Sequence, residues 1–215
     1  MKKDLTEIVF ILDESGSMCH LKSDTIGGFN SLIEKQRREK GEVLVSAVMF
    51  STTGRVVYDR VDLSEISEMT EKDYCPSGNT ALFDAIGSSV KHIGNVHKYA
   101  RNEDVPEHTL FVITTDGMEN ASRHYSRHEV KKMIERQKEK YGWEFLFLGA
   151  NIDAAETAES IGIEKESAVD YRADSTGTGK LFECLSFAVT NTRCGRKNSE
   201  SSAWRADLDA DIRRR

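Results

Sequence analysis

Short apolar runs alternate with longer amphipathic stretches along most of the chain. Apolar runs rich in β-branched and aromatic residues, too short for isolated helices, predict buried strands. They cover residues 8–12, 44–50, 109–115, 143–149 and, more weakly, 168–171. The stretch 55–61 alternates charged and apolar residues and follows the second run after only four residues. Because so short a link leaves no room for a helical crossover, we expect this strand to run antiparallel at an edge of the sheet.

Apolar residues at helical spacing separate these runs. Helices are predicted from Ser23 or Asp24 up to Gly41, over 82–93, from Ser126 onward, from Asn151 onward and over 178–190. The alternation of strand and helix predicts a doubly wound, Rossmann-like α/β sandwich of three layers. Its sheet should have six strands, mostly parallel, with one antiparallel edge strand. We expect one domain over residues 1–192 and a flexible tail over 193–215, where apolar residues stand singly.

Composition narrows the classes of protein. The 215 residues include 38% hydrophobic residues and carry a net charge of −6, which argues against a general nucleic-acid binder. No apolar run approaches the roughly 20 residues that a membrane-spanning helix needs, and no apolar signal region follows Lys2 and Lys3. Four scattered cysteines without a Cys-x-x-Cys pair indicate free thiols. We therefore expect a cytoplasmic protein with neither nucleic-acid nor membrane partners.

Oxygen-bearing side chains gather where strands are predicted to end. Asp13 closes the first strand and is followed by Ser15 and Ser17, while Asp116 closes the strand 109–115 and Thr80 begins a helix. In parallel sheets the crevice beyond the carboxyl ends of the strands binds ligands. Carboxylate and hydroxyl oxygens suit a hard divalent cation such as Mg²⁺. Each segment also has a structural interpretation, because Asp, Ser and Thr cap helices and an Asp-Gly pair begins turns.

The segment Asp13-Glu14-Ser15-Gly16-Ser17 resembles the Asp-x-Ser-x-Ser motif of von Willebrand factor A domains, the metal-ion-dependent adhesion site. The likeness covers residues 5 to 190 and is to intracellular, single-domain members. It places Thr80 and Asp116 at the family's fourth and fifth ligand positions. The resemblance implies that Asp13, Ser15, Ser17, Thr80 and Asp116 form a site for Mg²⁺, with Mn²⁺ or Ca²⁺ as the other candidates. In the family the aspartates often act through water.

The resemblance also implies a function in protein binding. An Asp or Glu of a partner protein would complete the coordination of the metal, and intracellular members often work beside an ATPase or another assembly. The neutral hydroxyls among the ligands leave the cation much of its charge, which favours such a carboxylate.

Two alternatives come from other classes. A Mg²⁺-dependent phosphohydrolase would use Asp13 as nucleophile, but Ser15 stands where its second acid belongs. A serine hydrolase built on Ser15 or Ser17 has only His20 nearby as a base. We therefore assign no catalytic residue and expect a protein that is not an enzyme. A structural subunit whose site stays without metal is the third interpretation.

Three further patterns lack a required residue. The stretch 175–180 resembles a phosphate-binding loop without its first glycine and final hydroxyl, and the stretch 207–211 resembles a calcium loop without its glycine. His124 and His128 have no third metal ligand in the sequence. We interpret all three as ordinary surface sequence.

Overall fold

The computed structural model describes residues 1–213, whose strands form a single six-stranded sheet in the order β3-β2-β1-β4-β5-β6. Neighbouring strands are parallel except β3, which runs antiparallel to β2 at one edge. The strands are β1 Lys2–Asp13, β2 Glu42–Phe50, β3 Gly54–Asp62, β4 Pro106–Thr115, β5 Glu144–Gly149 and β6 Ala168–Asp170. The predicted sheet, with its antiparallel edge strand, is confirmed.

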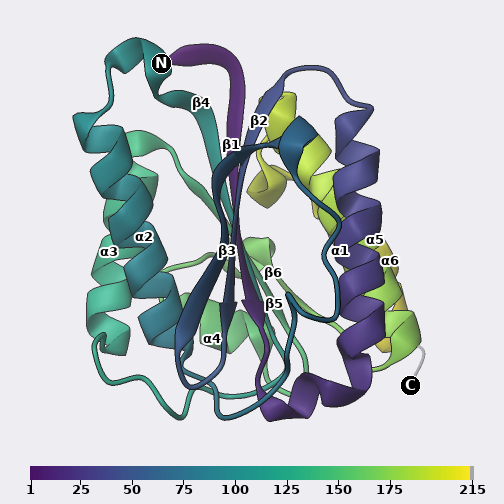
Figure 1. Cartoon of the computed structure of the whole chain (residues 1–215). Coiled ribbons are helices and arrows are strands. Elements are labelled where there is room, and N and C mark those ends of the chain that lie inside the picture. Colours follow the sequence, from purple (N-terminus) through teal and green to yellow (C-terminus); the bar gives the residue numbers. More distant parts are fainter. Residues whose placement is uncertain (214–215) are drawn as a thin grey trace.

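Helices cover both faces of the sheet (Figure 1). One layer contains α1, α5 and α6, and the opposite layer contains α2, α3 and α4. The helices are α1 Lys22–Arg37, α2 Leu82–Tyr99, α3 Arg127–Tyr141, α4 Ala154–Ser160, α5 Ser175–Arg193 and α6 Ala206–Arg213. The fold is therefore the predicted doubly wound sandwich. A membrane-spanning helix is absent from residues 1–213, since none of their helices combines sufficient length with sufficient apolar character.

The central strand β1 is apolar without interruption because both of its faces are covered. Phe10 and Leu12 pack toward α1 and α5, whereas Val9 and Ile11 pack toward α2 and α3. All four side chains are buried, because each face of the strand meets a helical layer. The polar residues that follow Leu12 consequently emerge at the carboxyl edge of the sheet, beside the end of β4.

The predicted start of the first helix differs from the structure. A short 3₁₀ helix, Gly16–Leu21, leads directly into α1, so Leu21 holds the N-cap position and no side chain caps the helix. The expected caps, Ser23 and Asp24, lie inside the first turn of α1. Ser17 therefore lies in the first turn of the 3₁₀ helix, directly after the end of β1.

The C-terminal segment also differs from the prediction of a flexible tail after residue 192. Two short 3₁₀ helices and α6 follow α5, and they bury Trp204 and Leu208, which are 1% and 0% exposed. These two side chains lie four residues apart, on one side of the helical turn, and join the core cluster that includes α5. Single apolar residues thus suffice to anchor the segment up to residue 213. The end of the expected tail, residues 214–215, lies outside the described residues.

Candidate metal site

Asp13 joins the ends of the two central parallel strands. Its side chain is 1% exposed, and its carboxylate oxygens accept two different hydrogen bonds. Oδ1 accepts the backbone N–H of Ser15 at 2.7 Å, and Oδ2 accepts the hydroxyl of Thr115 at 2.6 Å. The carboxylate is therefore fixed between the loop that follows β1 and the end of β4.

The two serines of the motif connect Asp13 with Asp116. The hydroxyl oxygens of Ser15 and Ser17 lie 3.1 Å apart, and the Ser17 hydroxyl donates to Asp116 Oδ1 at 2.7 Å. Two neighbouring ligands of an octahedral Mg²⁺, each about 2.1 Å from the metal, lie about 3.0 Å apart. The spacing of the serine oxygens matches that value. Because Ser17 gives its proton to Asp116, it accepts the hydroxyl proton of Ser15, and its second lone pair remains available to a cation.

Thr80 is held beside the same loop by its backbone. Its N–H donates to Asn120 Oδ1 at 2.9 Å, and its carbonyl accepts the N–H of Asn120 at 3.0 Å. A Cβ built on Gly117 would lie 3.9 Å from the Thr80 hydroxyl oxygen, so this hydroxyl is next to the residue that follows Asp116. The N-cap interpretation of Thr80 is wrong, because Ala81 holds that position, and the first-turn N–H groups of Phe83 and Asp84 donate to the side chains of Glu119 and Ser122.

The structure thus brings together the three separate pieces of chain predicted to form the site. Asp13, Ser15, Ser17 and Asp116 belong to one hydrogen-bonded cluster that includes Thr115. Thr80 stands beside the cluster, and the N–H of Gly16 donates to the carbonyl of Gly78 at 3.1 Å, which joins the two loops. That these residues are metal ligands remains a prediction.

Glu14, the variable position of the motif, fastens the loop that leads to Thr80. Its carbonyl accepts the N–H of Ser77 at 2.8 Å, and its buried carboxylate accepts the guanidinium of Arg55 at 3.0 Å and the N–H of Cys75 at 3.3 Å. Sequence reasoning missed this role, because no local pattern marks a carboxylate that binds backbone 61 residues away.

Two further carboxylates, also missed, shape the loop after Asp116. Asp84 accepts the backbone N–H groups of residues 123, 124 and 125, each at 2.8 Å. Glu119 accepts those of residues 121 and 122, and that of Phe83 at the start of α2. Because both carboxylates bind backbone groups, their role is to hold the loop against α2 rather than to ligate a cation.

The electrostatics of the cluster fit a bound cation. Burial raises the pKa of Asp13, hydrogen bonds from Ser15 and Thr115 oppose this effect, and the neighbouring charge of Asp116 adds to it. Asp116 is buried, and its Oδ2 has no hydrogen-bond partner among residues 1–213. Within residues 1–213, no ion pair joins either aspartate to a basic side chain. A divalent cation would supply the missing positive charge and a ligand position for the unpartnered oxygen.

The composition of the cluster restricts the metal. No group of three or more His, Cys, Asp or Glu side chains suited to a metal occurs in the described part of the chain. A cation at this site would therefore depend on the hydroxyl oxygens, which are weak ligands for soft metals and adequate for hard ones. The residues present fit a hard divalent cation such as Mg²⁺.

His20 is not placed as a base for either serine. Its Nδ1 lies 2.8 Å from the carbonyl oxygen of Ser17, and its Nε2 lies 3.1 Å from that of Ala173. Both ring nitrogens thus face backbone acceptors rather than a serine hydroxyl. This geometry does not support the serine-hydrolase interpretation.

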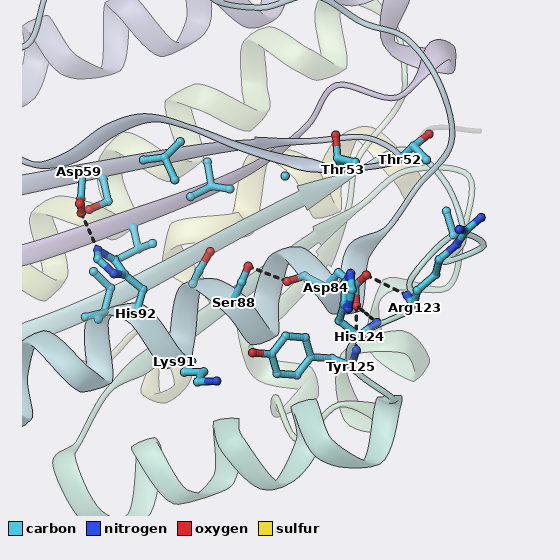
Figure 2. A pocket seen from close by; sticks show the side chains of 18 residues that line it. Thr52, Thr53, Asp59, Asp84, Ser88, Lys91, His92, Arg123, His124 and Tyr125 are labelled. Atoms are coloured by element: carbon cyan, nitrogen blue, oxygen red, sulfur yellow. Dashed lines mark hydrogen bonds and ion pairs between the residues drawn. The ribbon is translucent and has the colours of Figure 1, made fainter.

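A cavity of about 970 Å³ lies between the sheet edge and α2, and it contains none of the five predicted ligands. Figure 2 shows Asp84 within its wall, bound to the backbone of the loop 123–125, and His92 joined to Asp59 of β3. Thr52 lines one end of the cavity, and its hydroxyl accepts the N–H of Asn79 at 3.0 Å. The cavity therefore borders the loop that delivers Thr80.

The sequence matches no protein-family model and no curated protein. Solved structures resemble it in fold. Proximal thread matrix protein 1 from the mussel byssus superposes with a TM-score of 0.57 at 16% identity, over 86% of this chain and 46% of that one. A form of that protein with a zinc-occupied metal-ion-dependent adhesion site gives 0.57 at 15% identity, over 86% and 45%.

A third structure, von Willebrand factor type A from Catenulispora acidiphila, gives a TM-score of 0.57 at 13% identity, over 84% of this chain and 41% of that one. The chain spans less than half the length of each of these solved structures. Likeness at this level of identity concerns the fold. The chain has the fold of a von Willebrand factor type A domain.

Proposed function

We propose that this protein is a divalent-metal-dependent protein-binding module. Ser15, Ser17 and Thr80 would hold the cation through their hydroxyl oxygens, and Asp13 and Asp116 would hold it directly or through water. When bound, the cation supplies a position at which a carboxylate of a partner protein can replace a water molecule. The partner would therefore present an Asp or Glu, and we propose Mg²⁺ as the metal.

The observation that carries the proposal is the spacing of the two serine hydroxyls, 3.1 Å, within a cluster that contains two buried carboxylates. One carboxylate oxygen, Asp116 Oδ2, has no hydrogen-bond partner in the described part of the chain. The zinc-occupied adhesion site of the mussel protein supports the proposal by likeness of fold. Ser15 stands where a phosphohydrolase would place its second acid, and its N–H binds Asp13, so we propose a protein that is not an enzyme.

Metal-dependent capture tests this function. Wild-type protein and a Ser15→Ala/Ser17→Ala double variant are immobilised, exposed to a lysate in Mg²⁺ or EDTA, and the retained proteins are identified by mass spectrometry. A partner should be retained by the wild type in Mg²⁺ alone. Ser77→Ala is the matched control, because Ser77 is exposed on the neighbouring loop and its hydroxyl contacts only the carbonyl of Cys75 among the described residues.

The captured partner is then tested for its ligand. Replacement of its essential Asp or Glu by Asn or Gln should abolish retention by the wild-type protein. Retention that is equal in EDTA, or equal for the double variant, would contradict a metal-dependent module.

A further inference from the structure

At the carboxyl edge of the sheet and in the helical layer beside it, two buried hydroxyl groups have no hydrogen-bond partner among residues 1–213. They belong to Tyr171, which follows β6, and to Thr178 of α5. Both side chains are buried, and Tyr171 belongs to the core cluster between the sheet and the helices α1 and α5. Buried polar groups in proteins nearly always have a hydrogen-bond partner, and ordered water commonly provides it. The hydroxyls of Tyr171 and Thr178, both on this side of the sheet, therefore call for a ligand.

Tyr171 lies at the same sheet edge as the site. Its N–H donates to the carbonyl of Gly149 at 2.9 Å, and the next residue of that loop, Ala150, donates to the carbonyl of Thr115 at 2.9 Å. Asp116 follows Thr115, so β5 alone separates the backbone of Tyr171 from that of Asp116. Asn151 strengthens the link, because its side-chain amide donates to the carbonyl of Asp116 at 3.3 Å.

The side chain of Tyr171 lies in the core cluster on the α1 and α5 face of the sheet, within electrostatic range of the two aspartates. Burial raises the pKa of its phenol well above the usual range, and the negative charges of Asp116 and then Asp13 raise it further. A second tyrosine on this side of the sheet, Tyr74, donates its hydroxyl to the carbonyl of Asp13 at 2.5 Å. The Tyr74 hydroxyl therefore has a protein partner. The hydroxyl of Tyr171 and Oδ2 of Asp116 are both buried, and neither has a hydrogen-bond partner within residues 1–213.

We propose that Tyr171 is a positioning residue of the metal site, acting through an ordered water molecule. The phenol donates a hydrogen bond to the water, and the water donates one to Oδ2 of Asp116. Ser17 already holds Oδ1, so the water would fix the second oxygen and with it the orientation of the carboxylate. The effect of Tyr171 on metal binding rests on the proposed function, whereas the water bridge between Tyr171 and Asp116 does not.

Replacement of Tyr171 by Phe tests the bridge, with Tyr58→Phe as the matched control. Tyr58 donates its hydroxyl to the carbonyl of Ser67 at 2.9 Å and lies on β3, away from the site. Mn²⁺ is titrated into each protein and free Mn²⁺ is followed by electron paramagnetic resonance, and thermal midpoints are measured without metal. We expect Tyr171→Phe to weaken Mn²⁺ binding about 10-fold, as loss of groups that orient metal ligands commonly does, and to leave the thermal midpoint unchanged or lowered.

Two other outcomes would contradict the proposal. If Tyr171→Phe raises the thermal midpoint and leaves Mn²⁺ affinity unchanged, the hydroxyl is simply unsatisfied and the bridge does not exist. If the wild-type protein binds no Mn²⁺, the proposed function fails. The bridge is then decided by the thermal midpoints and by a crystal structure at a resolution that shows water. Density for water between Tyr171 and Asp116 supports the bridge, and its absence overturns it.

Discussion

Helices α1 and α5 pack against each other at a glycine, which makes their packing testable. A Cβ built on Gly28 would lie 2.1 Å from Cδ2 of Phe182, a distance at which atoms overlap. A Cβ built on the preceding residue, Gly27, would meet nothing within 4 Å. Both glycines lie inside α1, so the two substitutions to alanine share the same change in helix propensity and differ in the clash.

The magnitudes follow from these two contributions. Alanine in place of glycine in a helix interior stabilises a protein by roughly 0.5–1 kcal/mol. Overpacking of a well-filled interface costs about 1–3 kcal/mol. Gly27→Ala should therefore increase the free energy of unfolding by up to about 1 kcal/mol. The free energy of unfolding of Gly28→Ala should be about 1–3 kcal/mol lower than that of Gly27→Ala, which is the cost of the clash with Phe182. The gain in helix propensity is the same in both variants and cancels in this difference.

Urea unfolding at equilibrium, followed by circular dichroism, measures both values. If the free energy of unfolding falls with urea concentration at the same slope in both variants, they differ in stability rather than in the surface exposed on unfolding. If Gly28→Ala proves as stable as Gly27→Ala, Phe182 does not pack over Gly28. The described contact between α1 and α5 would then be wrong.

Three other predictions concern the C-terminal segment, a buried acid and a buried thiol. Leu208→Ala should lower the free energy of unfolding by about 2–5 kcal/mol in urea titrations, and no change would indicate that α6 is not packed. Burial raises the pKa of Glu144, although hydrogen bonds from Asn198 oppose this effect. The folded protein therefore favours the protonated acid, and the stability that Glu144 contributes is lost as the pH rises through its pKa in the folded state. Glu144→Gln should therefore raise the thermal midpoint above that of the wild-type protein at pH 7. This increase should vanish below the pKa of an exposed glutamate, and an increase that is the same at all pH values would refute the prediction. Burial raises the pKa of the Cys184 thiol to about 11. Iodoacetamide at pH 8 should therefore modify Cys184 far more slowly than the exposed cysteines Cys19, Cys75 and Cys194. Peptide mass spectrometry measures the four rates, and equal rates would contradict the burial of Cys184.

Much of the fold could be predicted because the strands are buried on both faces. An uninterrupted apolar run as short as the one ending at Leu12 is typical of a strand between two helical layers. The short link between β2 and β3, residues 51–53, required β3 to be antiparallel, since no crossover fits. The site residues Asp13 and Asp116 were predictable for a related reason. Each is the first carboxylate after such a run, and parallel neighbours bring their ends together.

The parts of the fold and of the site that could not be predicted depend on contacts that leave no local pattern in the sequence. Trp204 and Leu208 stand among polar residues, and only the surface offered by α5 and the sheet makes them core residues. The carboxylates of Glu14 and Asp84 bind backbone groups far away in the sequence, and such partners follow from the tertiary structure alone. The water-linked role proposed for Tyr171 likewise requires knowing that Asp116 lies two strands away in the same sheet.

Calorimetric titration of the metal-free protein with Mg²⁺ tests the central claim most directly. The account predicts one saturable site per chain, lost in Ser15→Ala/Ser17→Ala and retained in Ser77→Ala. Absence of binding by the wild-type protein, or equal binding by the double variant, would show that the cluster at the end of β1 is not a metal site.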